Sequence, residues 1–408
     1  MLRKIDSGEL RLGMYVSSLD RPWVETAFLF QGLKLERLED IQYLQERCAY
    51  VYVDDERSDL QSSAPRSRLY RKPRDPVSVL REQYGEPVVY EDKHSAEDEL
   101  RTARPLYQSA LNLIGELWAR IDAGQPLPLS EARQVAEGVV ESVLRNPDAF
   151  MWLRLLRSSD NYTYRHAVDS CSLAAAFGRQ IGLPRKVLGE VALGALLMDI
   201  GKTRVARELL QRRGALDEAE MEQLRGHVEH GLELIHKSGK VPEVTLEMVR
   251  THHERFNGEG YPRGLAGAQI PVVGRMAAIV DCYDAITSDR PYQKAVTPHE
   301  AVRLMYEWRN VDFQEELIEQ FIQCLGVYPT GSLVELNSGE VGIVYAQNRV
   351  RRLRPKIMLV LGRDKQPLDF APTVDLLSEA ENEDGMKLAI VRAVDPGEFD
   401  IDLADYYL

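Results

Sequence analysis

Apolar side chains recur at helical spacing through most of the middle of this chain, from residue 95 to residue 325. Two windows show the spacing clearly: Leu111, Ile114, Leu117, Trp118 and Ile121, and then Val135, Val139, Val143 and Leu144. This period places the apolar residues on one face of each helix, and that face must be buried against another helix. We therefore predict a mainly α fold built around one all-helical domain over 95–325.

The segments on either side of this domain have the alternating pattern of strands. Residues 14–17 and 49–53 predict a small α+β domain over 1–60. After Tyr328, the sequence GSLVELNSGEVGIVYAQ contains two alternating runs, and KIMLVL and MKLAIVRA follow. These runs predict a small β appendage over 326–408.

A polar and basic stretch, which contains QSSAPRSRLYRKPRDP, separates the first domain from the helical one. It has few apolar residues to bury, and its prolines interrupt regular structure. We interpret 61–94 as a linker. A phosphate or partner site in its basic cluster stays open as the alternative.

Charge and composition limit the functions that are open to the chain. The 51 basic and 64 acidic residues leave a net charge of −13, which repels duplex DNA or RNA. No apolar run reaches the roughly 18 residues that span a bilayer, and the N-terminal MLRKIDSGELRLGMYV lacks the apolar core of a signal peptide. The four cysteines form no C-x-x-C pair, which fits a reducing compartment. We expect a cytoplasmic protein with no membrane span and no nucleic-acid duplex as partner.

Histidines and aspartates gather inside the predicted helical domain. Six of the eight histidines lie within 166–253. Asp281 stands in the apolar sequence AAIVDCYDAI, where a buried carboxylate needs a partner, and a metal would supply one. Taken singly, these signals have plainer explanations, such as a histidine satisfied in a core, or an ion pair between Asp199 and Lys202 three residues later.

Several motifs follow one another in a specific order. They are DIGK at 199–202, a histidine at 227, HHERFNGEGYPRGLAGAQIP from residue 252, and D-x-x-DAITSDRPY from residue 281. Together they closely resemble the HD-GYP branch of the HD phosphohydrolase superfamily over about 155–325. The N-terminal unit is also similar to one that precedes many cytoplasmic HD-GYP domains.

The resemblance implies a metal centre. Carried over residue by residue, its ligands are His166, Asp199, His227, His252, His253 and Asp281. Asp199 would bridge two sites, one with His166 and Asp281 and the other with the remaining histidines. Trinuclear members of the family have a glutamate where this chain has Tyr162, so one or two divalent metals are implied, with Fe or Mn favoured by histidine and carboxylate ligands.

One position departs from the family. The His-Asp pair for which the family is named is Met198-Asp199 in this chain. A thioether is a soft and weak ligand for Fe or Mn, so the first site loses a ligand. The alternative is that Met198 belongs to the ordinary apolar core of VALGALLM.

HD-GYP proteins hydrolyse cyclic di-GMP to the linear dinucleotide pGpG, and some members continue to GMP. For this chain the resemblance implies the same activity, with Asp199 and Lys202 as catalytic residues. It places Lys202, Tyr261, Arg290 and Lys294 against the substrate, and it implies GGDEF-domain proteins as partners of the GYP loop. Ordinary roles stay open: an exposed lysine for Lys202, an ion pair for Arg290, and loop packing for Tyr261.

Two other functions also stay open. Without an imidazole at residue 198, the protein could be a catalytically silent receptor or scaffold that binds cyclic di-GMP or acts through its GYP surface. Because HD proteins cleave many phosphate esters, another nucleotide could be the substrate. Metal stoichiometry separates a silent receptor from an enzyme.

Overall fold

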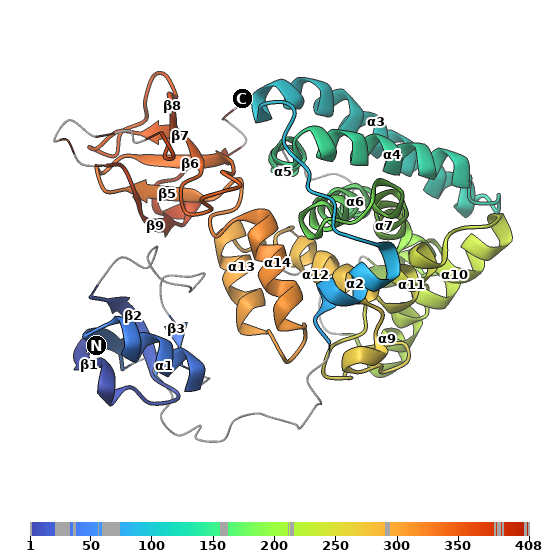
Figure 1. The fold of residues 1–408 in the computed structure, drawn as a ribbon. Coiled ribbons are helices and arrows are strands. Elements are labelled where there is room, and N and C mark those ends of the chain that lie inside the picture. Colours follow the sequence, from blue (N-terminus) through green and yellow to red (C-terminus); the bar gives the residue numbers. More distant parts are fainter. Residues whose placement is uncertain are drawn as a thin grey trace. The chain divides into compact units, whose positions relative to one another are not determined.

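The computed structural model describes residues 2–20, 33–35, 38–55, 57–58, 74–155, 162–210, 212, 216–289, 294–378, 381, 385, 387–403 and 406. The chain divides into two compact units, Met1–Lys72 and Pro73–Leu408 (Figure 1). The first unit contains a small sheet, and the second contains most of the helices together with a second sheet.

The described residues of the first unit form a four-stranded antiparallel sheet, in the order β1-β4-β2-β3, and an α-helix. Its elements are β1 (Leu2–Asp6), the 3-10 turn η1 (Ser7–Glu9), β2 (Tyr15–Leu19), β3 (Leu33–Lys34), α1 (Leu38–Arg47) and β4 (Tyr50–Asp54). Alternation along β4 turns Val51 and Val53 into the core, where they are fully buried together with Leu44 of α1. The small α+β domain that the alternating runs predict is confirmed.

Helices make up most of the second unit. They are α2 (Pro76–Tyr84), α3 (Ala96–Asp122), α4 (Leu129–Arg145), α5 (Pro147–Leu153), α6 (Tyr162–Ile181), α7 (Arg185–Leu197), α8 (Arg207–Leu210), α9 (Glu218–Arg225), α10 (His227–Ser238), α11 (Glu243–Thr251), α12 (Val272–Ile286), α13 (Pro298–Glu307) and α14 (Glu315–Leu325), with the 3-10 turns η3 (Ile200–Arg204) and η4 (Gly267–Gln269). The helical domain that the apolar spacing predicts is confirmed. None of the described helices has the length and apolar character needed to cross a bilayer.

Helices α6 and α7 pack side by side at the centre of the helical domain, with α3 and α4 on one side and α11 and α12 on another (Figure 1). Every residue of the sequence VALGALL in α7 is buried. A helix that is apolar all round belongs inside a protein, and the central position of α7 follows from its sequence. The residue directly after this helical segment therefore emerges deep in the fold.

One helix lies within the predicted linker 61–94. Asp75 caps the N-terminus of helix α2, because its carboxylate accepts a hydrogen bond of 2.9 Å from the backbone N–H of Ser78. Leu80 is only 3% exposed, and α2 packs against α12. The sequence did not reveal this helix because its apolar face is short. Residues 59–73, which contain most of the basic cluster, lie outside the described residues.

A five-stranded antiparallel sheet, in the order β8-β7-β6-β5-β9, follows the last helix. Its elements are β5 (Leu333–Leu336), β6 (Val341–Ala346), β7 (Lys356–Leu361), β8 (Thr373–Asp375), β9 (Ile390–Val394) and the 3-10 turn η5 (Pro396–Glu398). Asp148 of α5 joins this sheet to the helices, because its Oδ2 accepts hydrogen bonds from Gln347 N at 3.0 Å and from Arg349 Nη2 at 2.7 Å. The predicted β structure after the helical domain is confirmed.

Candidate metal centre

Five helices of the second unit bring the predicted ligands together. His166 lies on α6, Asp199 follows α7, His227 begins α10, His252 and His253 follow α11, and Asp281 lies on α12. The turn after Asp199 packs closely on α10, since a Cβ on Gly201 would lie 1.9 Å from the carbonyl oxygen of His227. The six side chains form two groups that share Asp199.

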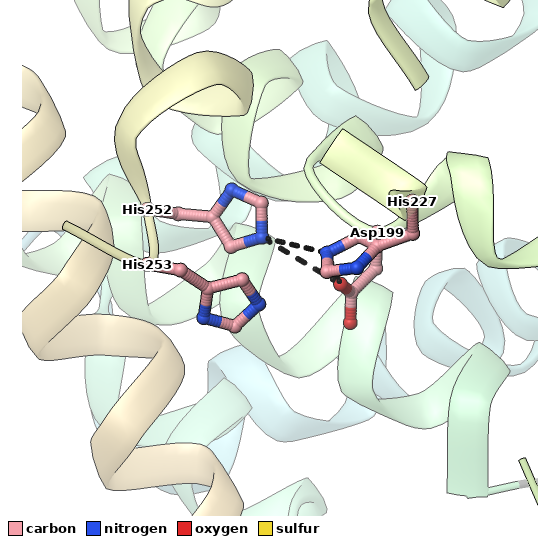
Figure 2. A group of neighbouring side chains, drawn as sticks. All are labelled: Asp199, His227, His252 and His253. Carbon is pink, nitrogen blue, oxygen red and sulfur yellow. Dashed lines mark hydrogen bonds and ion pairs between the residues drawn. The ribbon is translucent and has the colours of Figure 1, made fainter. Parts of the chain in front are cut away.

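The first group, which we call the imidazole group, consists of Asp199, His227, His252 and His253. Figure 2 shows the three rings around the Asp199 carboxylate. Asp199 Oδ1 lies 3.3 Å from His227 Nε2 and 3.7 Å from His252 Nε2, and the two Nε2 atoms are 3.3 Å apart. All four side chains are buried or nearly so. Ligand atoms of this kind at this spacing could hold one metal ion.

Backbone hydrogen bonds fix the tautomers of two of these rings. The Nδ1 atoms of His227 and His252 lie 2.7 Å and 2.8 Å from the carbonyl oxygens of Leu224 and Val249. A carbonyl oxygen only accepts, so both Nδ1 atoms carry a proton, and a ring that carries only this proton presents a lone pair at Nε2. Asp199 Oδ1 has no hydrogen-bond donor among the described residues. Three buried lone pairs thus face one another, an arrangement that a cation satisfies.

The second group, which we call the carboxylate group, consists of His166, Asp199 and Asp281. His166 Nε2 lies 3.3 Å from Asp199 Oδ2 and 3.2 Å from Asp281 Oδ1. Burial lowers the pKa of His166, but the stacked ring of Tyr162 and the two carboxylates together raise it well above its ordinary value. A metal in this group would therefore have to displace a proton.

Asp284 and Arg154 support His166 from behind, and the sequence did not identify either role. Asp284 Oδ2 lies 2.7 Å from His166 Nδ1, and Asp284 Oδ1 accepts a hydrogen bond of 2.6 Å from Arg154 Nη2. Both are buried. A carboxylate behind a histidine orients the ring and makes it a better metal ligand. The available signal was a second carboxylate one turn after Asp281 in the same apolar helix.

Burial and charge set the protonation of the imidazole group. Burial lowers the pKa of His227 and of His253, and the adjacent His252 lowers that of His253 further. Burial by itself raises the pKa of Asp199, but Lys202 and the surrounding histidines hold it well below its ordinary value. At neutral pH His227 and His253 are therefore neutral and Asp199 is ionised, as metal ligation requires.

Two of the four predicted substrate contacts lie beside the centre. Lys202 Nζ lies 2.5 Å from Asp199 Oδ2, so the ion pair of the plainer explanation is present. The Tyr261 ring packs on that of His253, with centroids 4.5 Å apart. Lys294 is exposed and belongs to neither group, whereas Arg290 lies outside the described residues.

The GYP loop is held in place by Glu254, another residue that the sequence did not single out. This carboxylate is 1% exposed and accepts hydrogen bonds of 2.8 Å and 2.9 Å from the backbone N–H groups of Arg263 and Leu265. At Gly260 the need for glycine is steric, since a Cβ would lie 2.2 Å from the backbone nitrogen of Arg255. The loop is therefore fixed against the end of α11, next to His253.

Met198 is fully buried at the end of α7. This burial is consistent with core packing, as the apolar run before Met198 suggests. The loss of a metal ligand at this position stays a prediction. Among the described residues, the carboxylate group has one imidazole and the imidazole group has three.

Two family models match this chain. The model of the HD domain covers residues 151–317, and a model described as a domain of unknown function (DUF3391) covers residues 2–132. The helical fold and its clustered histidines and aspartates thus belong to a hydrolase domain of the HD class, for which a divalent metal is expected.

Known proteins narrow the class further. Cyclic di-GMP phosphodiesterase PA4108 of Pseudomonas aeruginosa is 35% identical over 372 residues, which cover 90% of this chain and 87% of that protein. The 3'3'-cGAMP-specific phosphodiesterase 2 of Vibrio cholerae is 33% identical over 128 residues, 31% of this chain and 24% of that protein. The solved structure of Bd1817, a HDG"Y"P protein from Bdellovibrio bacteriovorus, is 15% identical with a TM-score of 0.47, and the match covers 79% of this chain and 98% of that one. The chain belongs to the HD-GYP family of phosphodiesterases, as its motifs predicted.

Proposed function

We propose that this protein is a cytoplasmic, metal-dependent phosphodiesterase that hydrolyses cyclic di-GMP to pGpG, and to GMP where the second bond is also cleaved. The observation that carries the proposal is the meeting of Asp199 Oδ1, which has no donor among the described residues, with the Nε2 atoms of His227 and His252, whose Nδ1 atoms already donate to backbone carbonyls. The substrate is inferred from a relative that is named a cyclic di-GMP phosphodiesterase and whose match covers 90% of this chain.

The residues present fit a divalent transition metal, with Fe or Mn favoured by nitrogen and carboxylate ligands. The imidazole group would hold one ion through His227, His252, His253 and Asp199, and the carboxylate group a second. Such an ion supplies Lewis acidity toward the phosphoryl oxygens and activates the attacking water.

The protein's own side chains would do the remaining work. Asp199 offers one oxygen to each group and so fixes their separation. Burial lowers the pKa of Lys202, but the Asp199 carboxylate raises it above its ordinary value, so Lys202 stays charged. Its ammonium can therefore stabilise the negative charge that grows on the phosphate. We place Tyr261, Arg290 and Lys294 around the rest of the substrate.

A receptor or scaffold that binds cyclic di-GMP without cleaving it is the second candidate. The observation in its favour is Met198, a buried thioether at the position where the family has a ligand. In that case the imidazole group keeps its metal, the carboxylate group stays empty, and the GYP loop serves as a surface for GGDEF-domain proteins.

Metal analysis beside a turnover assay tests both candidates. We would load the protein with Mn²⁺ or Fe²⁺, count metal per chain, and follow cyclic di-GMP and 3'3'-cGAMP in parallel. His252→Ala should lower metal affinity at least about 10-fold, since even changes behind the ligands have that effect. His236→Ala is the matched control, because His236 is exposed on α10, outside both groups.

Each outcome of this experiment has one meaning. Turnover of cyclic di-GMP that follows metal content supports the enzyme. Metal and cyclic di-GMP binding without turnover supports the receptor, and faster cleavage of 3'3'-cGAMP reassigns the substrate. Wild-type protein that takes up no transition metal under any loading condition refutes the metal centre.

A further inference from the structure

Arg225 is a cation at the edge of the candidate site. It is the last residue of α9 and is exposed. Its Cζ lies 5.3 Å from the centroid of the Tyr261 ring. Among the described residues no carboxylate pairs with it and no group accepts a hydrogen bond from it. By contrast, Arg212, which precedes α9, forms an ion pair with Glu220 of α9. In a chain with a net charge of −13, an uncompensated guanidinium is available to an anion.

The Tyr261 ring connects Arg225 to the metal centre. It packs against His253 with centroids 4.5 Å apart and an interplanar angle of 30°, and its backbone N–H donates to the His253 carbonyl oxygen at 3.1 Å. The Tyr261 ring thus contacts both a proposed metal ligand and this arginine.

A cyclic dinucleotide carries two phosphodiesters on opposite sides of its ring, and a single metal centre can hold only one of them for cleavage. Resting on the function proposed above, we infer that Arg225 binds the second, uncleaved phosphodiester. A guanidinium suits this task because its planar fork matches two phosphate oxygens. The aromatic ring beneath it limits the conformations that the side chain loses on binding. Lys202, a second cation beside the centre, is already paired with Asp199.

The inference predicts a change in selectivity between substrates with one phosphate and with two. In Arg225→Gln, the ratio of kcat/KM for cyclic di-GMP to kcat/KM for bis(p-nitrophenyl) phosphate should fall at least about 10-fold, mainly through KM, because a charged hydrogen bond is lost. Arg225→Lys keeps the charge without the fork and should fall between the two proteins. Arg101→Gln is the matched control, since Arg101 is exposed on α3 and belongs to neither group of the centre.

Binding separates this inference from the proposed function. Calorimetry of cyclic di-GMP with metal-free protein needs no turnover, and Arg225→Gln should weaken that binding by about 10-fold or more. If the wild-type protein binds the dinucleotide but never cleaves it, the catalytic proposal fails while the role of Arg225 is still measured. An unchanged Kd and an unchanged substrate ratio in Arg225→Gln would overturn the inference, and so would an equal loss in Arg101→Gln.

Discussion

Replacing Asp284 with asparagine should weaken metal binding by reversing the tautomer of a ligand. The carboxylate now accepts from His166 Nδ1 at 2.7 Å and from Arg154 Nη2 at 2.6 Å. An amide has one accepting and one donating end. If its oxygen faces Arg154, its NH₂ faces His166 Nδ1, which must then be unprotonated, and the proton moves to Nε2, the atom that would bind metal. The opposite orientation places the NH₂ against the guanidinium.

The magnitude follows from the burial of these groups. Loss of a partner behind a ligating histidine costs about 10- to 100-fold in metal affinity. Removing one partner of a buried ion pair costs about 3 to 5 kcal/mol. We expect the lower end, about 3 kcal/mol, since Arg154 Nε still lies 3.9 Å from Asp169 Oδ2. Metal titration against a chelator and urea unfolding of the metal-free protein measure the two effects separately.

Asp169→Asn is the matched control for this prediction. Asp169 is also a buried carboxylate near Arg154, and it accepts a hydrogen bond of 2.8 Å from the Tyr107 hydroxyl, whereas the carboxylate at His166 Nδ1 is that of Asp284. It should lower the free energy of unfolding and leave metal affinity within about twofold, well inside the 10-fold effect expected of a group behind a ligand. Equal metal affinities in Asp284→Asn and Asp169→Asn would refute the tautomer argument.

Two further predictions concern other positions. Met198→His should raise metal per chain and the rate of cyclic di-GMP hydrolysis with added Mn²⁺ or Fe²⁺, because it restores the His-Asp pair; unchanged values of both would mean that the departure at residue 198 is neutral. Burial raises the pKa of Glu99, but hydrogen bonds from Arg145 and Ser142 lower this pKa below its ordinary value of 4.5. The ionised carboxylate therefore stabilises the fold above pH 4.5, and this stabilisation is lost as the pH falls through the folded-state pKa. Glu99→Gln should therefore cost about 2 kcal/mol in urea unfolding at pH 7 and progressively less in acid, and a penalty that does not change with pH would contradict this explanation.

The sequence predicted those parts of the fold whose signal is local. The run KIMLVL is strand β7 itself, and the two apolar windows lie in α3 and α4, because alternation and the 3.6-residue period are properties of neighbouring residues. Helix α2 was missed because a helix of this length depends on tertiary packing, such as the burial of Leu80 and the contact of α2 with α12, which no local pattern contains.

The same distinction holds at the centre. The resemblance to a known family implied six ligands, and the structure brings all six of these side chains together. The supporting residues could not be proposed, because each acts through a contact between distant segments. Asp284 reaches His166 across 118 positions of the chain, and Arg225 meets Tyr261 only once α9 and the GYP loop have packed. A carboxylate or a guanidinium in a sequence does not reveal which partner will neutralise it.

The two oxygens of Asp199 lie in different electrostatic surroundings, and this difference argues for an order of metal binding. On one side, Oδ2 is 2.5 Å from Lys202 Nζ and 3.3 Å from His166 Nε2, so positive charge already lies beside it. On the other side, Oδ1 faces the lone pairs of His227 and His252 and has no donor among the described residues. An ion entering the imidazole group displaces nothing and relieves that repulsion, whereas an ion entering the carboxylate group must compete with an ammonium and a proton. The imidazole group should therefore fill first and hold its metal more tightly, with any second ion bound more weakly and more sensitive to acid.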